Sequence, residues 1–250
     1  MYCFVDSNIP PTGLPNLGNS CYANSLIQCL RNLPAVQTTS IKSLLRSDAS
    51  TLLSQVIKSD LPAYKINPGS QEDALELFNL LCEKHPDLHK QFAVGFHQRL
   101  NCTCGHSSSS TLPWENYVNA SRKESNSMES FLHSSLETLK DFKCDECHKT
   151  GTTIKRLSIG KISSCLVLAC ANMQKIPCSF PAQLAFENAN GKTLVYKLVA
   201  GMQYYGGGNS GHWTAAVLKN TWYGISDSSV SHLPVMPSSY TVFYHLLKAE

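Results

Sequence analysis

Apolar residues recur at helical spacing near the start of the chain. They fall at i, i+4, i+7 and i+8, which marks one face of a helix. These positions are Tyr22, Leu26, Cys29 and Leu30. The preceding segment 13–20 is rich in Gly, Pro, Asn and Ser, which are typical of turns and helix caps. We therefore predict a helix over 21–32, capped by Asn19 or Ser20 and ended by Pro34.

Two further stretches complete the helical part of the sequence. Residues 70–82 begin with Ser70, a candidate N-cap, and carry the carboxylate of Asp73 in the first turn, where it suits the helix dipole. The apolar positions that follow are Ala74, Leu75, Phe78, Leu81 and Cys82. Residues 40–58 show a broken helical pattern, and residues 59–69 are typical of a loop.

The rest of the chain favours strands. Its last third holds short apolar runs separated by Gly, Asn, Asp and Ser turns. These runs are 194–199, 213–219, 222–226 and 240–247. In the middle, 92–100 and 152–157 are strand-like, 166–170 is typical of a buried strand, 107–110 indicates a polar turn, and 121–127 is expected to be exposed. Helices followed by strands predict an α+β fold.

Composition narrows the class of protein. The 250 residues, 42% of them hydrophobic, suffice for one large domain or two tight lobes. A net charge of +3 without basic runs argues against nucleic-acid binding. No apolar run approaches the ~18 residues of a membrane span, and we see no signal peptide. Eleven cysteines in a chain of this length favour reduced thiols, some of them on a metal, and a cytosolic or nuclear protein.

Cys21 and His212 are candidates for nucleophilic catalysis. A helix N-terminus favours the thiolate of Cys21, and a nearby histidine would lower its pKa further. Unpaired N–H groups at the helix start, with the side chain of Asn16, could hold an oxyanion. His212 follows the glycines 206–208 and begins a strand. The alternatives are a buried structural cysteine and a structural histidine beside Trp213.

Four further cysteines indicate a metal site. Cys144 and Cys147 form a Cys-x-x-Cys pair, and Cys102 with Cys104 is a tighter candidate second pair. Four thiolates bind zinc tetrahedrally and leave no open position for water, so the zinc would be structural. His106 or His148 could replace one sulfur, and the alternative is a set of incidental cysteines. The chain has no His-Glu-x-x-His motif, which disfavours a zinc hydrolase.

The segment around Cys21 resembles a known family. Gly-Leu-x-Asn-Leu-Gly-Asn-Ser-Cys-Tyr-x-Asn-Ser-x-x-Gln, over 13–28, is similar to the cysteine box of the ubiquitin-specific proteases. These are papain-like thiol hydrolases that cut after the C-terminal glycine of ubiquitin. Residues 209–215 resemble the family's histidine box, with Trp213 in place of Tyr. The resemblance implies that Cys21 is the nucleophile, His212 the base and Asn16 an oxyanion donor.

Residues 222–230 depart from the family at one position. They resemble Trp-Tyr-x-Phe-Asp/Asn-Asp-Ser-x-Val, which places Ser226 at the third position of the triad. A serine can orient an imidazole, but it brings no charge to stabilise the imidazolium. Adjacent strand residues point to opposite faces, so we predict that Ser226 orients His212 and that Asp227 assists near the oxyanion. The alternative is that Asp227 is the third member, through a local bulge.

The resemblance also implies substrate and metal contacts. The segment that begins at Gln71 is similar to the family's second motif, so Asp73 and Glu76 are expected to meet basic residues of the ubiquitin tail. Gly211 and Tyr205 are expected to line the path of its Gly-Gly end. Many members carry two zinc-binding hooks at the tips of β fingers. The four cysteines Cys102, Cys104, Cys144 and Cys147 fit that position.

We therefore expect one catalytic domain over 13–250 after a lead-in of 1–12. It would comprise a helical thumb (about 13–91), a palm and shortened fingers (92–160) and a β palm (161–250). The expected activity is cleavage of the (iso)peptide bond after the C-terminal glycine of ubiquitin, by a monomer with structural zinc and no organic cofactor. The alternatives are a protease for another ubiquitin-like modifier and a catalytically weak ubiquitin-binding scaffold. An unrelated thiol acyltransferase would not explain Asn16 or the Gln71 motif.

Overall fold

The computed structural model places the helices and the strands of this chain in separate layers. It describes residues 9–48, 51–52, 70–120, 132, 135–161, 163–170, 177–207 and 210–250. The predicted loop 59–69 and the predicted exposed segment 121–127 lie outside the described residues. Within them, no helix is both long enough and apolar enough to cross a membrane.

The helical layer comes from the first third of the chain. Its elements are α1 (Cys21–Arg31), the 3-10 helix η1 (Pro34–Thr38), α2 (Lys42–Leu45), α4 (Ala74–Lys84) and α5 (Pro86–Phe92). The predicted central helix is confirmed as α1, but Ser20 at its N-cap position makes no capping hydrogen bond. The predicted start of the second helix was wrong. Asp73, not Ser70, caps α4, because its carboxylate accepts a hydrogen bond from the Leu75 N–H at 2.8 Å.

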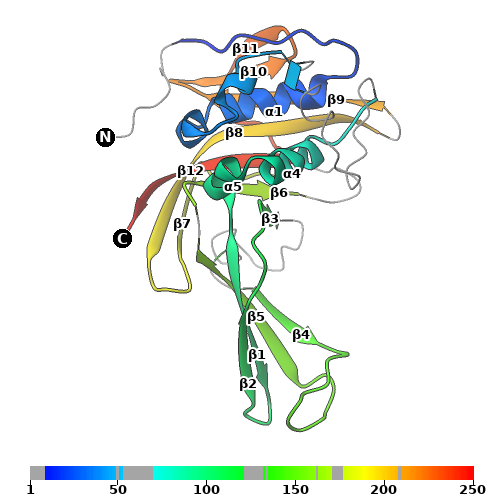
Figure 1. The fold of residues 1–250 in the computed structure, drawn as a ribbon, viewed down its shortest axis with the longest axis vertical. Coiled ribbons are helices and arrows are strands. Elements are labelled where there is room, and N and C mark those ends of the chain that lie inside the picture. Colours follow the sequence, from blue (N-terminus) through cyan, green and yellow to red (C-terminus); the bar gives the residue numbers. More distant parts are fainter. Residues whose placement is uncertain are drawn as a thin grey trace.

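Within the described residues, two sheets hold the strands, and Figure 1 shows the smaller one projecting from the body of the molecule. This distal sheet has the order β2-β1-β5-β4. Its strands are β1 (Gly95–Cys102), β2 (Ser107–Thr111), β4 (Ser135–Leu139) and β5 (Thr153–Lys161). The main sheet has eight strands in the described part of the chain, in the order β11-β10-β9-β8-β12-β6-β3 with β7 paired to β8. They are β3 (Val118–Asn119), β6 (Cys165–Ala169), β7 (Gln183–Glu187), β8 (Thr193–Gly207), β9 (Ser210–Leu218), β10 (Trp222–Ser226), β11 (Ser229–Leu233) and β12 (Thr241–Ala249).

The predicted strands of the last third are confirmed as β8, β9, β10 and β12. The predicted polar turn at 107–110 was wrong, since these residues form β2 and pair with β1, with Ser109 opposite Arg99. All five residues of β2 are exposed. An exposed strand has no buried face, so no alternation of apolar and polar residues marked it in the sequence.

The main sheet is buried on both faces. Along β12, Phe243 packs with the helices, whereas Val242 and Tyr244 pack into a second cluster on the other face. Along β6, Val167 and Leu168 divide in the same way. Side chains alternate between the faces of a strand, which explains the continuous apolar run at 166–170. Helix α1 therefore rests on a buried sheet and packs against the histidine strand, β9, and its neighbours β8 and β10.

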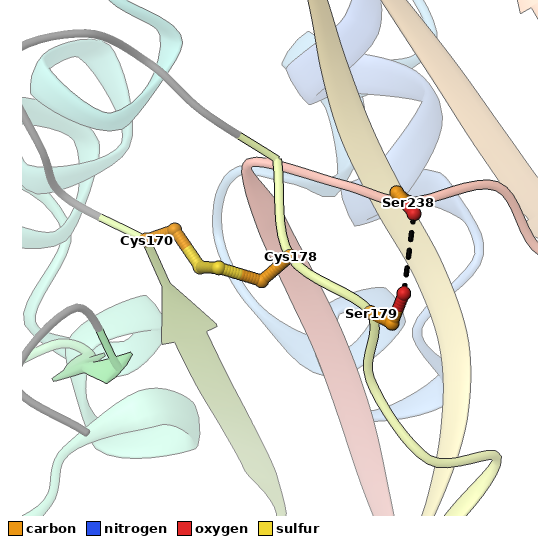
Figure 2. The surroundings of a disulfide bond; sticks show 4 residues. All are labelled: Cys170, Cys178, Ser179 and Ser238. Atoms are coloured by element: carbon orange, nitrogen blue, oxygen red, sulfur yellow. Dashed lines mark hydrogen bonds between the residues drawn. A yellow bond between two sulfur atoms is a disulfide. The ribbon is translucent and has the colours of Figure 1, made fainter. Parts of the chain in front are cut away.

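Figure 2 shows that two of the cysteines are paired. Cys170, which follows β6, forms a disulfide with Cys178. Cys178 is held to Ser239 by backbone hydrogen bonds, and Ser179 bonds to Ser238 at 3.2 Å (Figure 2). The prediction that the thiols are reduced was wrong for this pair. Two cysteines eight positions apart carry no spacing signal, and the fold brings them together by placing the β6 end beside the segment before β12.

Candidate active site

Cys21 is the first residue of α1 and is 2% exposed. Burial raises the pKa of its thiol above the ordinary value, and the nearby charge of Asp227 acts in the same direction. The backbone N–H of Trp213 and those at the helix start donate toward the sulfur and lower the pKa, but by less than burial raises it. The expectation of a lowered pKa was therefore wrong for the free protein, because desolvation outweighs the helix terminus.

His212 lies on β9, directly before Trp213. Its Nε2 is 2.9 Å from the hydroxyl oxygen of Ser226, the last residue of β10. The same nitrogen is 4.0 Å from Oδ2 of Asp227. Because Nε2 is engaged by Ser226, Nδ1 is the nitrogen that remains for exchanging a proton with a thiol.

Asp227 lies in the two-residue turn between β10 and β11, where Ser226 pairs with Ser229. Its φ is 48°, a left-handed conformation that Asp tolerates better than most residues. The rule that strand neighbours point to opposite faces therefore does not apply to it. This is why Ser226 and Asp227 both lie near Nε2 of His212.

Two amides hold the carboxylate of Asp227. Asn16 donates from Nδ2 to Oδ2 at 2.9 Å, and Asn24 donates from Nδ2 to Oδ1 at 2.7 Å. The backbone carbonyl of Asp227 accepts the N–H of Leu14 at 2.9 Å. The segment before Cys21, helix α1 and the end of β10 thus converge on one side chain.

The loop before Cys21 fixes the orientation of Asn16. Oδ1 of Asn16 accepts backbone N–H groups of Gly18 at 3.1 Å and Ser20 at 3.2 Å. These bonds leave Nδ2 as the donor group of the side chain. One of its hydrogens points to Asp227.

The residue before His212 is held from the helical layer. Gln71 accepts the N–H of Gly211 on Oε1 at 2.7 Å and donates from Nε2 to the Gly211 carbonyl. Tyr205 pairs with His212 across β8 and β9, and 59% of its surface is exposed. Of the residues expected to line the substrate path, Gly211 and Tyr205 therefore flank His212.

Asp73 and Glu76 lie at the start of α4. Asp73 uses its carboxylate as the helix cap, whereas Glu76 is exposed. Both charges reach Tyr240, whose pKa is raised chiefly by burial and further by Asp73, Tyr117 and Glu76. Tyr240 in turn packs on Trp213, with ring centres 5.5 Å apart. This acidic and aromatic group therefore adjoins the histidine strand.

The four predicted metal ligands come together at the turns of the distal sheet. The sulfur atoms of Cys102, Cys104, Cys144 and Cys147 lie within 4.8 Å of one another. Sulfur separations are 3.7 Å for Cys102–Cys147 and 3.8 Å for Cys104–Cys144. A tetrahedral site with Zn–S bonds of about 2.3 Å has S–S edges of about 3.8 Å. The donor set and its spacing fit zinc, without a contribution from His106 or His148.

Sequence reasoning missed two residues of the site. Asn24 is 2% exposed and bonds to Asp227 and to the carbonyl of Pro15 at 3.2 Å. An Asn among apolar helix positions is a signal for such a role, since a buried amide needs partners. Gln71 was noted only as part of a motif, and its partner Gly211 is 140 positions away.

The sequence of this chain is similar to those of known proteins. The sequence matches the family described as ubiquitin carboxyl-terminal hydrolase over residues 12–58 and 42–244. It is 24% identical to ubiquitin carboxyl-terminal hydrolase 36 of Drosophila melanogaster, covering 94% of this chain and 30% of that protein. It is 23% identical to human ubiquitin carboxyl-terminal hydrolase 42, covering 93% and 22%. The chain thus spans less than a third of the length of these curated relatives.

Solved structures share the fold. The SAGA Ubp8/Sgf11/Sus1/Sgf73 DUB module bound to ubiquitin aldehyde aligns with a TM-score of 0.74 at 20% identity, covering 100% of this chain and 72% of that one. A variant of the same module bound to monoubiquitin aligns with a TM-score of 0.73 at 20% identity, covering 98% and 71%. The fold is therefore the α+β, papain-like fold of the ubiquitin-specific proteases, as predicted. More particularly, this chain belongs to the ubiquitin carboxyl-terminal hydrolase family.

Proposed function

We propose that this protein is a cysteine deubiquitinase that cleaves the (iso)peptide bond after the C-terminal glycine of ubiquitin. The observation that supports the proposal is the pairing of His212 on β9 with Ser226 on β10, beside the helix α1 that begins at Cys21. The backbone N–H of Trp213 donates to the Cys21 sulfur, and Ser226 holds Nε2 of the adjacent His212 at 2.9 Å. Membership of the ubiquitin carboxyl-terminal hydrolase family supports ubiquitin as the substrate.

In this proposal His212 removes the proton of the Cys21 thiol through Nδ1 as the sulfur attacks the glycine carbonyl. The thiol starts protonated in the free protein because burial raises its pKa, so attack requires a base in place. The N–H groups at the start of α1 and the second hydrogen of Asn16 Nδ2 stabilise the oxyanion. His212 then returns the proton to the leaving amine, and water hydrolyses the thioester.

Ser226 and Asp227 support the proposed base, His212, in different ways. Ser226 orients the ring through a neutral hydrogen bond. Asp227, 4.0 Å from Nε2, supplies negative charge toward the imidazolium and also holds Asn16. Asp73, Glu76, Gly211 and Tyr205 are proposed contacts of the ubiquitin tail, since they lie at the start of α4 and beside His212.

The remaining parts of the proposal concern the wider domain. We assign residues 13–91 to a thumb, 92–160 to a palm and fingers insert, and 161–250 to a palm. Cys102, Cys104, Cys144 and Cys147 would hold a structural zinc ion, which would fix the two turns of the distal sheet. We also propose a monomer, and ubiquitin with its conjugates as the partner.

Covalent labelling tests the proposed function. The wild-type chain and Cys21→Ala would be treated with ubiquitin that carries a thiol-reactive C-terminal group, and with matching probes of other ubiquitin-like modifiers. A Cys21-dependent adduct with ubiquitin is the expected result. An adduct with another modifier alone would keep the mechanism and replace the substrate. Ubiquitin binding without any adduct would instead favour a scaffold.

A further inference from the structure

The end of β9 that carries His212 is paired on one side only. Pairing of β9 with β10 ends at Ala215, opposite Ile225, whereas β8 continues alongside β9 to Ser210. Gly211 pairs with Gly206, whose φ is 154°. Glycines restrict a backbone less than other residues do. The strand end beside His212 therefore needs a further contact to hold its position.

Gln71 provides that contact. Its side-chain amide bonds both the N–H and the carbonyl of Gly211, the residue directly before His212. Gln71 belongs to the segment that leads into α4, so the two bonds join the helical layer to the histidine strand. An amide side chain presents an N–H donor beside a carbonyl acceptor, as a peptide group does, so Gln71 makes the two bonds that a neighbouring strand would make to Gly211.

The other side of Gly211 is also in contact. A Cβ atom at this position would lie 2.1 Å from the hydroxyl oxygen of Tyr204. The Tyr204 ring packs against Trp213, with ring centres 5.1 Å apart. Gly211 is therefore held between the Tyr204 ring and the Gln71 amide, and any movement of Gln71 reaches His212 through one peptide bond.

We propose that Gln71 is a positioning residue for catalysis: through its double hydrogen bond to Gly211, it holds the backbone next to His212 and so the position of the proposed base. The proposal rests on the proposed function for its substrate. The bridge itself is a property of the free protein. Since small misplacements of a catalytic group reduce rates steeply, loss of the bridge should slow the chemical step and leave substrate binding largely unchanged.

The isosteric variant Gln71→Glu provides a diagnostic test. A protonated carboxyl can still accept from the Gly211 N–H and donate to its carbonyl, whereas a carboxylate can only accept. The facing carbonyl favours the protonated form and raises the pKa of the introduced carboxyl above the ordinary ~4.3. The bridge is therefore present at low pH and is lost as the pH rises through that pKa.

The experiment compares wild type, Gln71→Ala and Gln71→Glu, with Gln183→Ala and Gln183→Glu as matched controls on the exposed start of β7. The substrate is ubiquitin with a C-terminal fluorogenic amide. At pH 8 we expect kcat to fall about ten- to a hundredfold in both Gln71 variants, with KM within about threefold of wild type. Relative to wild type at the same pH, the kcat of Gln71→Glu should rise at least about fivefold between pH 8 and about pH 5.5. The relative kcat of Gln71→Ala should not rise.

A second measurement needs no modifier. Iodoacetamide alkylation of Cys21, followed on its peptide by mass spectrometry, depends at pH 7 on proton acceptance by His212. The rate should fall in Gln71→Ala toward the His212→Ala value and stay unchanged in Gln183→Ala. Melting temperatures identify any variant that fails to fold. If Gln71→Ala does not fold, the comparison uses Gln71→Glu at low pH instead.

The outcomes separate the two proposals. An unchanged kcat with a lower KM would mean that Gln71 competes with the substrate, and an unchanged kcat with a higher KM would make it a substrate contact. Either result overturns the positioning role. If wild type does not turn over the ubiquitin substrate, the proposed function fails, and the alkylation rates then decide alone. A lower rate in Gln71→Ala would support positioning, and an unchanged rate would overturn it.

Discussion

Replacing Ser226 should cost far less activity than replacing its neighbour Asp227. Ser226 is exposed and contributes one neutral hydrogen bond of 2.9 Å to His212. Such a bond is worth about 0.5–1.5 kcal/mol net, which corresponds to about a two- to twelvefold change in rate. We therefore expect Ser226→Ala to lower kcat by about this factor.

Asp227 carries two contributions. Its Oδ2 lies 4.0 Å from Nε2 of His212, where two unit charges interact by about 1 kcal/mol in water and about 4 kcal/mol at an effective dielectric constant of 20. The ring side chain is 39% exposed, so the lower part of this range applies. Asp227→Ala also removes the acceptor of Asn16 Nδ2, whereas Oδ1 of Asn16 keeps its bonds to the loop before Cys21. Complete loss of an oxyanion donor costs about a hundred- to a thousandfold in kcat, and we expect the lost charge together with a partly misplaced Asn16 to cost about a hundredfold.

The assay is kcat on the fluorogenic ubiquitin amide at pH 7.5, with Ser231→Ala on the exposed strand β11 as the matched control. Melting temperatures show whether each variant is folded. A loss of more than a hundredfold in Ser226→Ala together with less than tenfold in Asp227→Ala would refute the reasoning. It would mean that the serine hydroxyl alone carries the role of a third triad member.

Four further predictions concern stability, metal and pH. The purified chain should hold one zinc ion by mass spectrometry, and Cys144→Ser should lose it together with the hydrogen-exchange protection of β1 and β5. Reduction of the Cys170–Cys178 disulfide should lower the free energy of unfolding by about 2.5 kcal/mol for its short loop, and denaturation of Cys170→Ser should not respond to reductant. Removal of the helix cap in Asp73→Ala should lower the free energy of unfolding by about 1 kcal/mol, as measured by urea unfolding. Asp73→Asn, which can still cap the helix, should keep most of that stability. In His212→Ala, alkylation of Cys21 should keep rising above pH 9, because burial raises the pKa of the thiol, and a plateau below pH 8 would contradict this.

Local patterns in the sequence predicted the parts of the structure that local forces determine. Turn residues followed by helical spacing placed Cys21 at the start of α1, because capping and periodicity act within a few residues. The two cysteine pairs could be recognised for the same reason, since each pair lies within one turn, whereas the fold brings the two turns together. The helix start at Asp73 was missed by three residues because Ser70 and Asp73 are both acceptable caps, and only the fold selects between them.

Contacts between distant segments could not be predicted in this way. The Gln71–Gly211 bridge and the Asn24–Asp227 bond join residues that the topology of the main sheet brings together. Neither partner carries a signal of the other in its own neighbourhood. The position of Asp227 was misjudged for a related reason: strand alternation holds only within a strand, and the chain leaves β10 after Ser226.

That turn explains how a serine can stand where the family usually has Asp or Asn. The left-handed φ of Asp227 places its carboxylate 4.0 Å from Nε2 of His212, so negative charge is already present beside the ring. Ser226 supplies orientation through a neutral hydrogen bond, while Asn16 and Asn24 hold Asp227 in place. The serine therefore need not weaken catalysis as long as Asp227 and its two amide partners are retained.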